Sequence, residues 1–156
     1  MRTQKATNEP TQRRSSREAR ALAIKAINPA TGEQIAEYEE MTDAGVRDAI
    51  GKAHDAFLDW RRIDFSSRAK LMHRAAQVLR DNAGKYAKLM AQEMGKPIRD
   101  GVAEIQKCAL TCDFYADKAE RFLAPEPIKT EANKSFVIFQ PLGVVLAVMP
   151  WNFPFL

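Results

Sequence analysis

Apolar and polar side chains alternate with a helical period over residues 43–122. In the first stretch, 43–60, apolar side chains recur every three or four residues, at Val46, Ile50, Ala53, Phe57 and Trp60. This spacing places them on one face of a helix. Thr42 carries the hydroxyl that caps a helix N-terminus, and Asp43 favours the positive end of the helix dipole. We therefore predict a helix from Asp43 to Trp60 that packs through one apolar stripe.

A second helical pattern begins near Ser66 or Ser67, either of which is a suitable N-cap. Its apolar face contains Leu71, Ala75, Val78, Leu79, Tyr86, Leu89 and Met90. The Asn-Ala-Gly stretch at 82–84 predicts a kink or break. Gly95 suits the left-handed position after a helix, and Pro97 cannot continue the hydrogen-bond ladder. We expect this helical segment to end there.

A third helical pattern runs from about residue 98 to 122, and the prolines that follow end it. The side chains expected to face inward are Val102, Ile105, Cys108, Ala109, Cys112, Tyr115, Ala116 and Ala119. Asp100 and Glu104 form an i, i+4 carboxylate pair on the same helix. A solvated face is the expected setting of this pair, because a metal site needs more oxygen ligands.

Short extended segments flank the helices on both sides. Residues 21–27 and 35–38 are joined by the turn-rich sequence Asn-Pro-Ala-Thr-Gly, which predicts a hairpin. After the helices, 135–139 and 143–148 are rich in β-branched and aromatic residues, and Pro141 marks a boundary between them. The run 143–148 is apolar on both faces, which is typical of an interior strand of a parallel α/β sheet.

An interior parallel strand requires a crossover connection and further strands beside it. Only eight residues follow Val148. We therefore expect this chain to be the amino-terminal, truncated part of a longer α/β protein.

The charge balance separates a basic tail from a neutral body. The chain has 24 Lys and Arg against 20 Asp and Glu, a net charge of +4. This excess falls within residues 1–21, and residues 22–156 are neutral overall. A neutral body argues against nucleic acid as the main partner, because phosphate binding needs a basic face. We interpret the tail as a solvated, disordered extension.

The cellular compartment is predicted from two features of the sequence, the composition of the first residues and the length of the apolar runs. The tail has no apolar core typical of a secretory signal, and Gln140 and Pro141 interrupt the longest apolar run. We expect no membrane segment and a cytoplasmic location. An Arg- and Ser-rich leader is also typical of mitochondrial transit peptides, so the mitochondrial matrix stays open as the alternative, although Glu9 and Glu18 weigh against it.

Cysteines and histidines give no metal-site pattern. Cys108 and Cys112 are the only cysteines, and neither His54 nor His73 is near them in sequence. We expect two reduced, partly buried thiols. Both histidines are expected at the surface, without a carboxylate partner.

The chemically most informative stretch is Met-Pro-Trp-Asn-Phe-Pro at 149–154. Two prolines and two aromatics make a stiff turn at the carboxyl end of the expected interior strand, which is where α/β folds place ligand sites. Asn152 offers an uncharged amide donor there, the kind of group that stabilises an oxyanion without protonating it. The alternative is that Asn152 only satisfies backbone groups of the turn.

This stretch also carries a resemblance to a known family. Three segments occur in the family's order: Ile-Asn-Pro-Ala-Thr-Gly-Glu at 27–33, Glu-Met-Gly-Lys-Pro-Ile at 93–98, and Gln-Pro-Leu-Gly-Val-Val at 140–145 continued by Pro-Trp-Asn-Phe-Pro at 150–154. Together they resemble the beginning of NAD(P)-dependent aldehyde dehydrogenases over residues 22–156. The wording of the second segment is most similar to the succinate-semialdehyde dehydrogenase branch.

The resemblance implies a fold and a division of the chain. The fold class is α/β, with a β-hairpin, a helical layer and the first strands of a Rossmann-like parallel sheet. Residues 1–21 are the basic tail, 22–133 the hairpin and helical part of the cofactor-binding domain, and 134–156 an oligomerisation-type strand with the first sheet strand. A homodimer or homotetramer is implied for the full enzyme.

The resemblance also implies a mechanism. In the family a Cys thiolate attacks a small aldehyde, hydride passes to NAD or NADP, and a Glu activates water. Asn152 matches the family residue whose amide stabilises the thiohemiacetal oxyanion. Met149, Pro150, Trp151 and Asn152 match the segment that lines the nicotinamide side of the cofactor site, and Phe153 matches an aromatic near the substrate tunnel.

The family's nucleophilic Cys and general-base Glu lie downstream of this motif, so the resemblance predicts an inactive polypeptide. The residues that hold the adenosine phosphates would follow as well, which leaves NAD and NADP both open. The alternative function is a non-catalytic helical interaction or oligomerisation module, in which an exposed strand edge seeks a partner.

Overall fold

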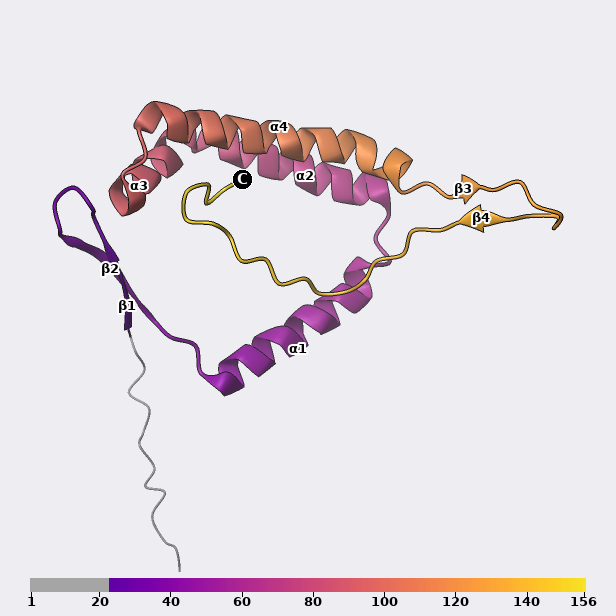
Figure 1. The fold of residues 1–156 in the computed structure, drawn as a ribbon, viewed down its shortest axis with the longest axis horizontal. Helices are drawn as coiled ribbons and strands as arrows, with labels where there is room; N and C mark the ends of the chain where they lie inside the picture. Colours follow the sequence, from indigo (N-terminus) through magenta and orange to yellow (C-terminus); the bar gives the residue numbers. More distant parts are fainter. Residues whose placement is uncertain (1–22) are drawn as a thin grey trace, which may run out of the picture.

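A computed structural model describes residues 23–156, so the predicted tail at 1–21 lies outside the described residues. Four helices are framed by two small antiparallel strand pairs (Figure 1). In chain order the elements are β1 Ala23–Ile27, β2 Gln34–Glu39, α1 Asp43–Trp60, α2 Phe65–Asp81, α3 Ala83–Met94, α4 Ile98–Phe122, β3 Glu126–Pro127 and β4 Phe136–Val137.

The core lies where α4 packs along α2 and α3, which run beside it in Figure 1. Its buried apolar residues are Ala76, Ala87, Met90, Ile105, Cys108 and Ala109. Small side chains dominate this set, so the helices lie close together. At Gly101 a Cβ atom would be 3.0 Å from both Cα and Cβ of Ala87, so only glycine fits without displacing α3.

The helix ends follow local capping chemistry. The Thr42 hydroxyl accepts a hydrogen bond from the Gly45 N–H at 3.1 Å, so the predicted cap of α1 is confirmed. For α2, the prediction of Ser66 or Ser67 as N-cap is wrong. Asp64 is the cap, and its two carboxylate oxygens accept from the N–H and the hydroxyl of Ser67, each at 2.8 Å. These bonds stabilise the charged carboxylate and lower the pKa of Asp64.

The predicted break at 82–84 and the end at Gly95 are both confirmed. Asn82 closes α2, with its side-chain amide donating to the Val78 carbonyl at 2.9 Å, and α3 begins at the next residue. Gly95 has φ of 76°, in the left-handed region that favours glycine. The chain then turns through Pro97 into α4.

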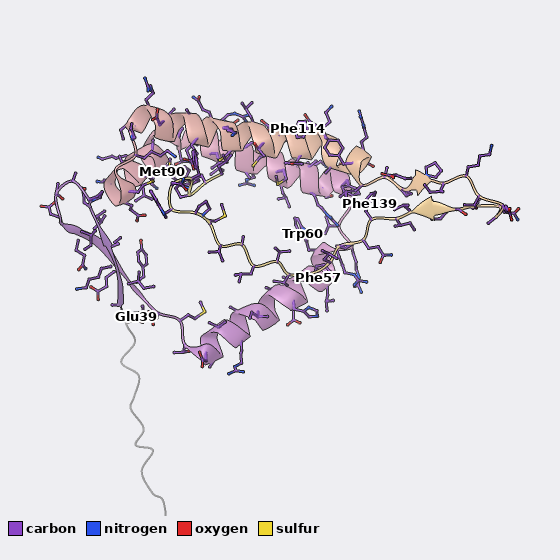
Figure 2. The ribbon with its side chains drawn as sticks, viewed as in Figure 1. Glu39, Phe57, Trp60, Met90, Phe114 and Phe139 are labelled. Carbon is purple, nitrogen blue, oxygen red and sulfur yellow. The ribbon has the colours of Figure 1, made fainter. Side chains whose placement is uncertain are left out.

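The apolar stripe of α1 is not buried, contrary to the prediction. The helix forms over the predicted residues, but none of them is buried, and Ile50 and Trp60 stay 58% and 44% exposed. Figure 1 shows the reason, because α1 diverges from the layer of α2 and α4. Figure 2 shows Phe57 and Trp60 at the end of α1 nearest to that layer.

The strands form only where a partner strand is present. β1 and β2 pair antiparallel with a register shift between Ala26 and Ile27, which confirms the hairpin. β4 pairs with β3 over two residues. The run 143–148 forms no strand, and Leu146 is 87% exposed. The prediction of an interior strand here is wrong for the described chain, because no other described strand lies beside the run to share its hydrogen bonds.

Candidate functional site

After the exposed run, the chain returns to the helical layer and ends against α3 and α4 (Figure 1). Phe155 is the residue that attaches it. Its N–H donates to Oε1 of Glu104 at 2.9 Å, its carbonyl accepts from the Cys108 thiol at 3.1 Å, and its ring lies 5.1 Å from that of Tyr86. These contacts join Phe155 to residues between 47 and 69 positions earlier in the chain and fix the end of the 151–154 turn.

A buried ion pair between Lys96 and Glu104 lies beneath this turn. The side chains are only 9% and 2% exposed. Besides its bond to Glu104, the Lys96 ammonium donates to the Asn152 carbonyl at 2.9 Å and lies 4.2 Å from the centre of the Phe153 ring. The expectation that Glu104 belongs to a solvated carboxylate pair with Asp100 is therefore wrong. Lys96 and the Phe155 N–H provide the partners that make its burial possible.

The predicted site residues lie in two settings. The backbone of Asn152 is bonded to Lys96, while its side chain is exposed and has no hydrogen bond to any of the residues described. Phe153 packs on Lys96. Met149 and Pro150 precede the turn and Trp151 begins it, and all three are exposed, with Trp151 77% exposed. The structure thus brings Asn152 and Phe153 to the ion pair and leaves the other three beside solvent.

An open pocket of about 400 Å³ lies against the same ion pair. Its lining residues come from the start of α4 and from the terminal segment: Lys96, Asp100, Ala103, Glu104, Lys107, Phe153 and Leu156. Two lysines and two carboxylates line it, so its formal charges balance. Of these residues, the family resemblance pointed to Phe153, and neither the resemblance nor the sequence pattern pointed to Lys96 or Glu104.

The two cysteines are free thiols, as predicted, and Cys108 is buried while Cys112 is half-buried. Burial raises the pKa of the Cys108 thiol, and the Glu104 carboxylate raises it further. A catalytic cysteine needs a lowered pKa and an accessible sulfur. Cys108 has the opposite properties and acts here as a hydrogen-bond donor to the backbone.

His73 has carboxylate partners, which corrects the sequence-based expectation. Its Nδ1 lies 2.8 Å from Asp113 and its Nε2 3.2 Å from Asp117, both on α4, and Arg80 also pairs with Asp113. The hydrogen bond to Asp113 raises the pKa of His73. His54 is exposed on α1, as predicted. The His73 cluster links α2 to α4 and lies on side chains that remain partly exposed.

The described residues offer few groups suited to a metal ion or to nucleotide phosphates. Among residues 23–156, no group of three or more His, Cys, Asp or Glu side chains is placed to hold a metal ion. The pocket that includes Trp151 measures about 210 Å³, and Glu93 is the one ionisable residue in its lining. A carboxylate does not suit phosphate groups, so this pocket does not fit a dinucleotide. No helix in the described part of the chain is long and apolar enough to cross a membrane.

Comparison with known proteins gives the family. Residues 16–156 match the aldehyde dehydrogenase family. The chain belongs to this family. The resemblance in three segments is thereby confirmed, and so is the predicted fold class, since solved aldehyde dehydrogenases share the fold of this chain.

Two similar curated relatives are succinate-semialdehyde dehydrogenases. The chain is 46% identical over 134 residues to a probable NADP⁺ enzyme of this name from Synechocystis sp., which covers 86% of the chain and 30% of the relative. It is 44% identical over 136 residues to the NADP⁺ enzyme of Mycobacterium leprae, with 85% and 30% covered. The chain therefore spans about 30% of the length of the relatives it matches.

Two solved structures show the same arrangement of the backbone. Succinic semialdehyde dehydrogenase from Streptococcus pyogenes, in complex with NADP⁺, superposes with a TM-score of 0.79 at 38% identity and covers 84% of this chain and 29% of that enzyme. An aldehyde dehydrogenase from Brucella melitensis biovar abortus superposes with a TM-score of 0.81 at 30% identity, with 86% and 28% covered.

Proposed function

We propose that this chain forms part of an aldehyde dehydrogenase that oxidises succinate semialdehyde or a similar small aldehyde to its acid with NADP⁺. The substrate and cofactor are supported by the names of the relatives from Synechocystis and Mycobacterium leprae and by the NADP⁺ complex of the Streptococcus pyogenes enzyme. The balanced charges of the 400 Å³ pocket give no added preference for a substrate that carries a carboxylate.

Asn152 is the catalytic residue that this part of the enzyme contributes. When a thiolate adds to an aldehyde, the carbonyl oxygen gains negative charge, and an amide N–H aimed at it lowers the barrier. The support is geometric. The backbone of Asn152 is held by Lys96, and its amide is exposed and free of hydrogen bonds to the described residues. This arrangement disfavours the alternative, in which the amide only satisfies backbone groups of the turn.

The neighbours of Asn152 divide between cofactor and substrate. In this proposal Met149, Pro150 and Trp151 line the nicotinamide side, and NADP⁺, when bound, accepts the hydride. Their exposure leaves them accessible to such a ring. The pocket that includes Trp151 does not suit the phosphates, so in this proposal these three residues contact only the nicotinamide end. Phe153 faces the aldehyde from the pocket of about 400 Å³.

In this proposal neither Cys108 nor Cys112 is the nucleophile, because both lie within α4, in the helical layer where the resemblance places no nucleophile. The raised pKa of Cys108 keeps its sulfur protonated, and its hydrogen bond to Phe155 turns it toward the protein interior. We therefore propose that the 156-residue polypeptide does not oxidise aldehydes by itself. The exposed apolar residues Phe136, Val137 and Ile138 support the further proposal that subunits pair through this strand as a homodimer or homotetramer.

The test uses a chimera. Residues 16–156 replace the superposed segment of the Streptococcus pyogenes enzyme, which supplies the rest of the active site. We expect the chimera to form NADPH with succinate semialdehyde, measured by the absorbance of the reduced nicotinamide, and the 156-residue chain alone to form none. A folded chimera that binds NADP⁺ and does not oxidise the aldehyde, beside an active unmodified enzyme, would contradict the proposed function.

A further inference from the structure

Each residue of the Lys96–Glu104 ion pair also forms a hydrogen bond to the backbone of the terminal segment. Burying two charges is unfavourable unless further hydrogen bonds satisfy them. Here the further bonds go to the backbone at 152 and 155: Lys96 donates to the Asn152 carbonyl, and Glu104 accepts from the Phe155 N–H, each at 2.9 Å. The pair thus holds both ends of the short segment that contains the catalytic amide.

Lys96 holds Asn152 by its backbone, which leaves the side-chain amide free to donate hydrogen bonds. Lys96 contacts the carbonyl oxygen of Asn152, so the side-chain amide keeps its N–H groups for a ligand. The Lys96 ammonium also fixes the next residue, because it lies 4.2 Å from the centre of the Phe153 ring. An oxyanion donor is effective only within about 2.7–3.1 Å of the reacting oxygen, and a displacement of about 1 Å costs about 10²-fold in rate.

We infer that Lys96 and Glu104 are positioning residues that place the Asn152 amide for oxyanion stabilisation through their bonds to the backbone at 152 and 155. This inference rests on the proposed function of Asn152. Neither residue touches the reacting atoms in this account. Their effect on turnover passes through Asn152, and this dependence separates positioning from a purely structural role.

The test replaces both charges together in the chimera. Lys96→Met alone would leave Glu104 buried without its cation, whereas K96M/E104M puts apolar side chains of similar length in place of both. We expect kcat to fall about 10- to 100-fold, with KM for NADP⁺ within about twofold, because the lost interaction acts in the transition state. Lys96→Arg keeps a cation able to bond both Glu104 and Asn152, so we expect it to retain most of the turnover.

The matched control is another ion pair of the same chain. Lys52 and Asp48 lie 2.7 Å apart on α1, with side chains 77% and 63% exposed. Removing them as K52M/D48M makes the same chemical change away from the turn, and we expect kcat to stay the same. An equal loss of kcat in this control would overturn the inference.

The decisive measurement repeats K96M/E104M in an Asn152→Ala background. If the pair acts through Asn152, its removal costs no more than about twofold once the amide is absent. The same 10- to 100-fold loss in both backgrounds would overturn the inference and leave the proposed function intact. An Asn152→Ala variant with unchanged kcat would instead refute the proposed function. Should K96M/E104M not fold, K96Q/E104Q, which removes both charges and keeps polar side chains, carries the same comparison.

Discussion

At Gly101, α4 leaves no room for a side chain against α3. A Cβ atom there would lie 3.0 Å from two atoms of Ala87, one of them backbone, and 3.2 Å from Cε of Met90. Gly101→Ala therefore forces the two helices apart at a buried contact. Overpacking of this kind costs about 1–3 kcal/mol, against a gain of about 1 kcal/mol in helix propensity. We expect the free energy of unfolding to fall.

Gly84 provides the matched control in the same helical layer. It lies in α3, and a Cβ atom added there has nothing within 4 Å. Gly84→Ala gains helix propensity, up to about 1 kcal/mol, without strain. Urea denaturation of the 156-residue chain, followed by helical circular dichroism, should move the midpoint upward for Gly84→Ala and downward for Gly101→Ala. Equal upward shifts for the two variants would refute the described packing of α3 on α4.

Two further predictions concern side chains that link or begin helices. The folded-state pKa of His73 is raised by Asp113, so its stabilising bond is fully present below the ordinary histidine pKa of 6.5 and is lost as the pH rises through the raised value. Unfolding midpoints measured against pH should fall over this range in the wild type and not in a His73→Asn variant. The same fall in His73→Asn would show that another group causes the pH dependence. Asp64→Ala should lower the urea midpoint because α2 loses its cap, whereas Ser66→Ala should leave the midpoint unchanged. A lower midpoint for Ser66→Ala and an unchanged one for Asp64→Ala would identify Ser66 as the cap.

Local patterns predicted the elements better than their packing. The period of apolar residues predicted α1 and α4, because a helix is set by neighbours three and four residues apart, and capping and proline signals predicted where they begin or end. The cap of α2 was misplaced although its signal was present, since Asp64 stands three residues before Ser67. The run 143–148 has the composition of a strand, but a strand also needs a partner, which composition does not provide.

The site shows the same limit more sharply. The amide of Asn152 was recognisable from its residue type and its turn. The environment of Glu104 was not, because one partner, Lys96, precedes the helix by two residues and the other, Phe155, lies 51 positions further along the chain. His73 was missed for the same reason, since its partner Asp113 lies 40 positions away. Such long-range pairs follow from the fold and leave no periodic trace in the sequence.

The proposed role of Asn152 as the oxyanion donor of an aldehyde dehydrogenase predicts a large loss of turnover when its amide is removed. Asn152→Ala in the chimera tests it most directly, with steady-state NADPH formation from succinate semialdehyde as the readout. We expect kcat to fall about 10²–10³-fold while KM for NADP⁺ is retained. A turnover equal to that of the unsubstituted chimera would contradict it.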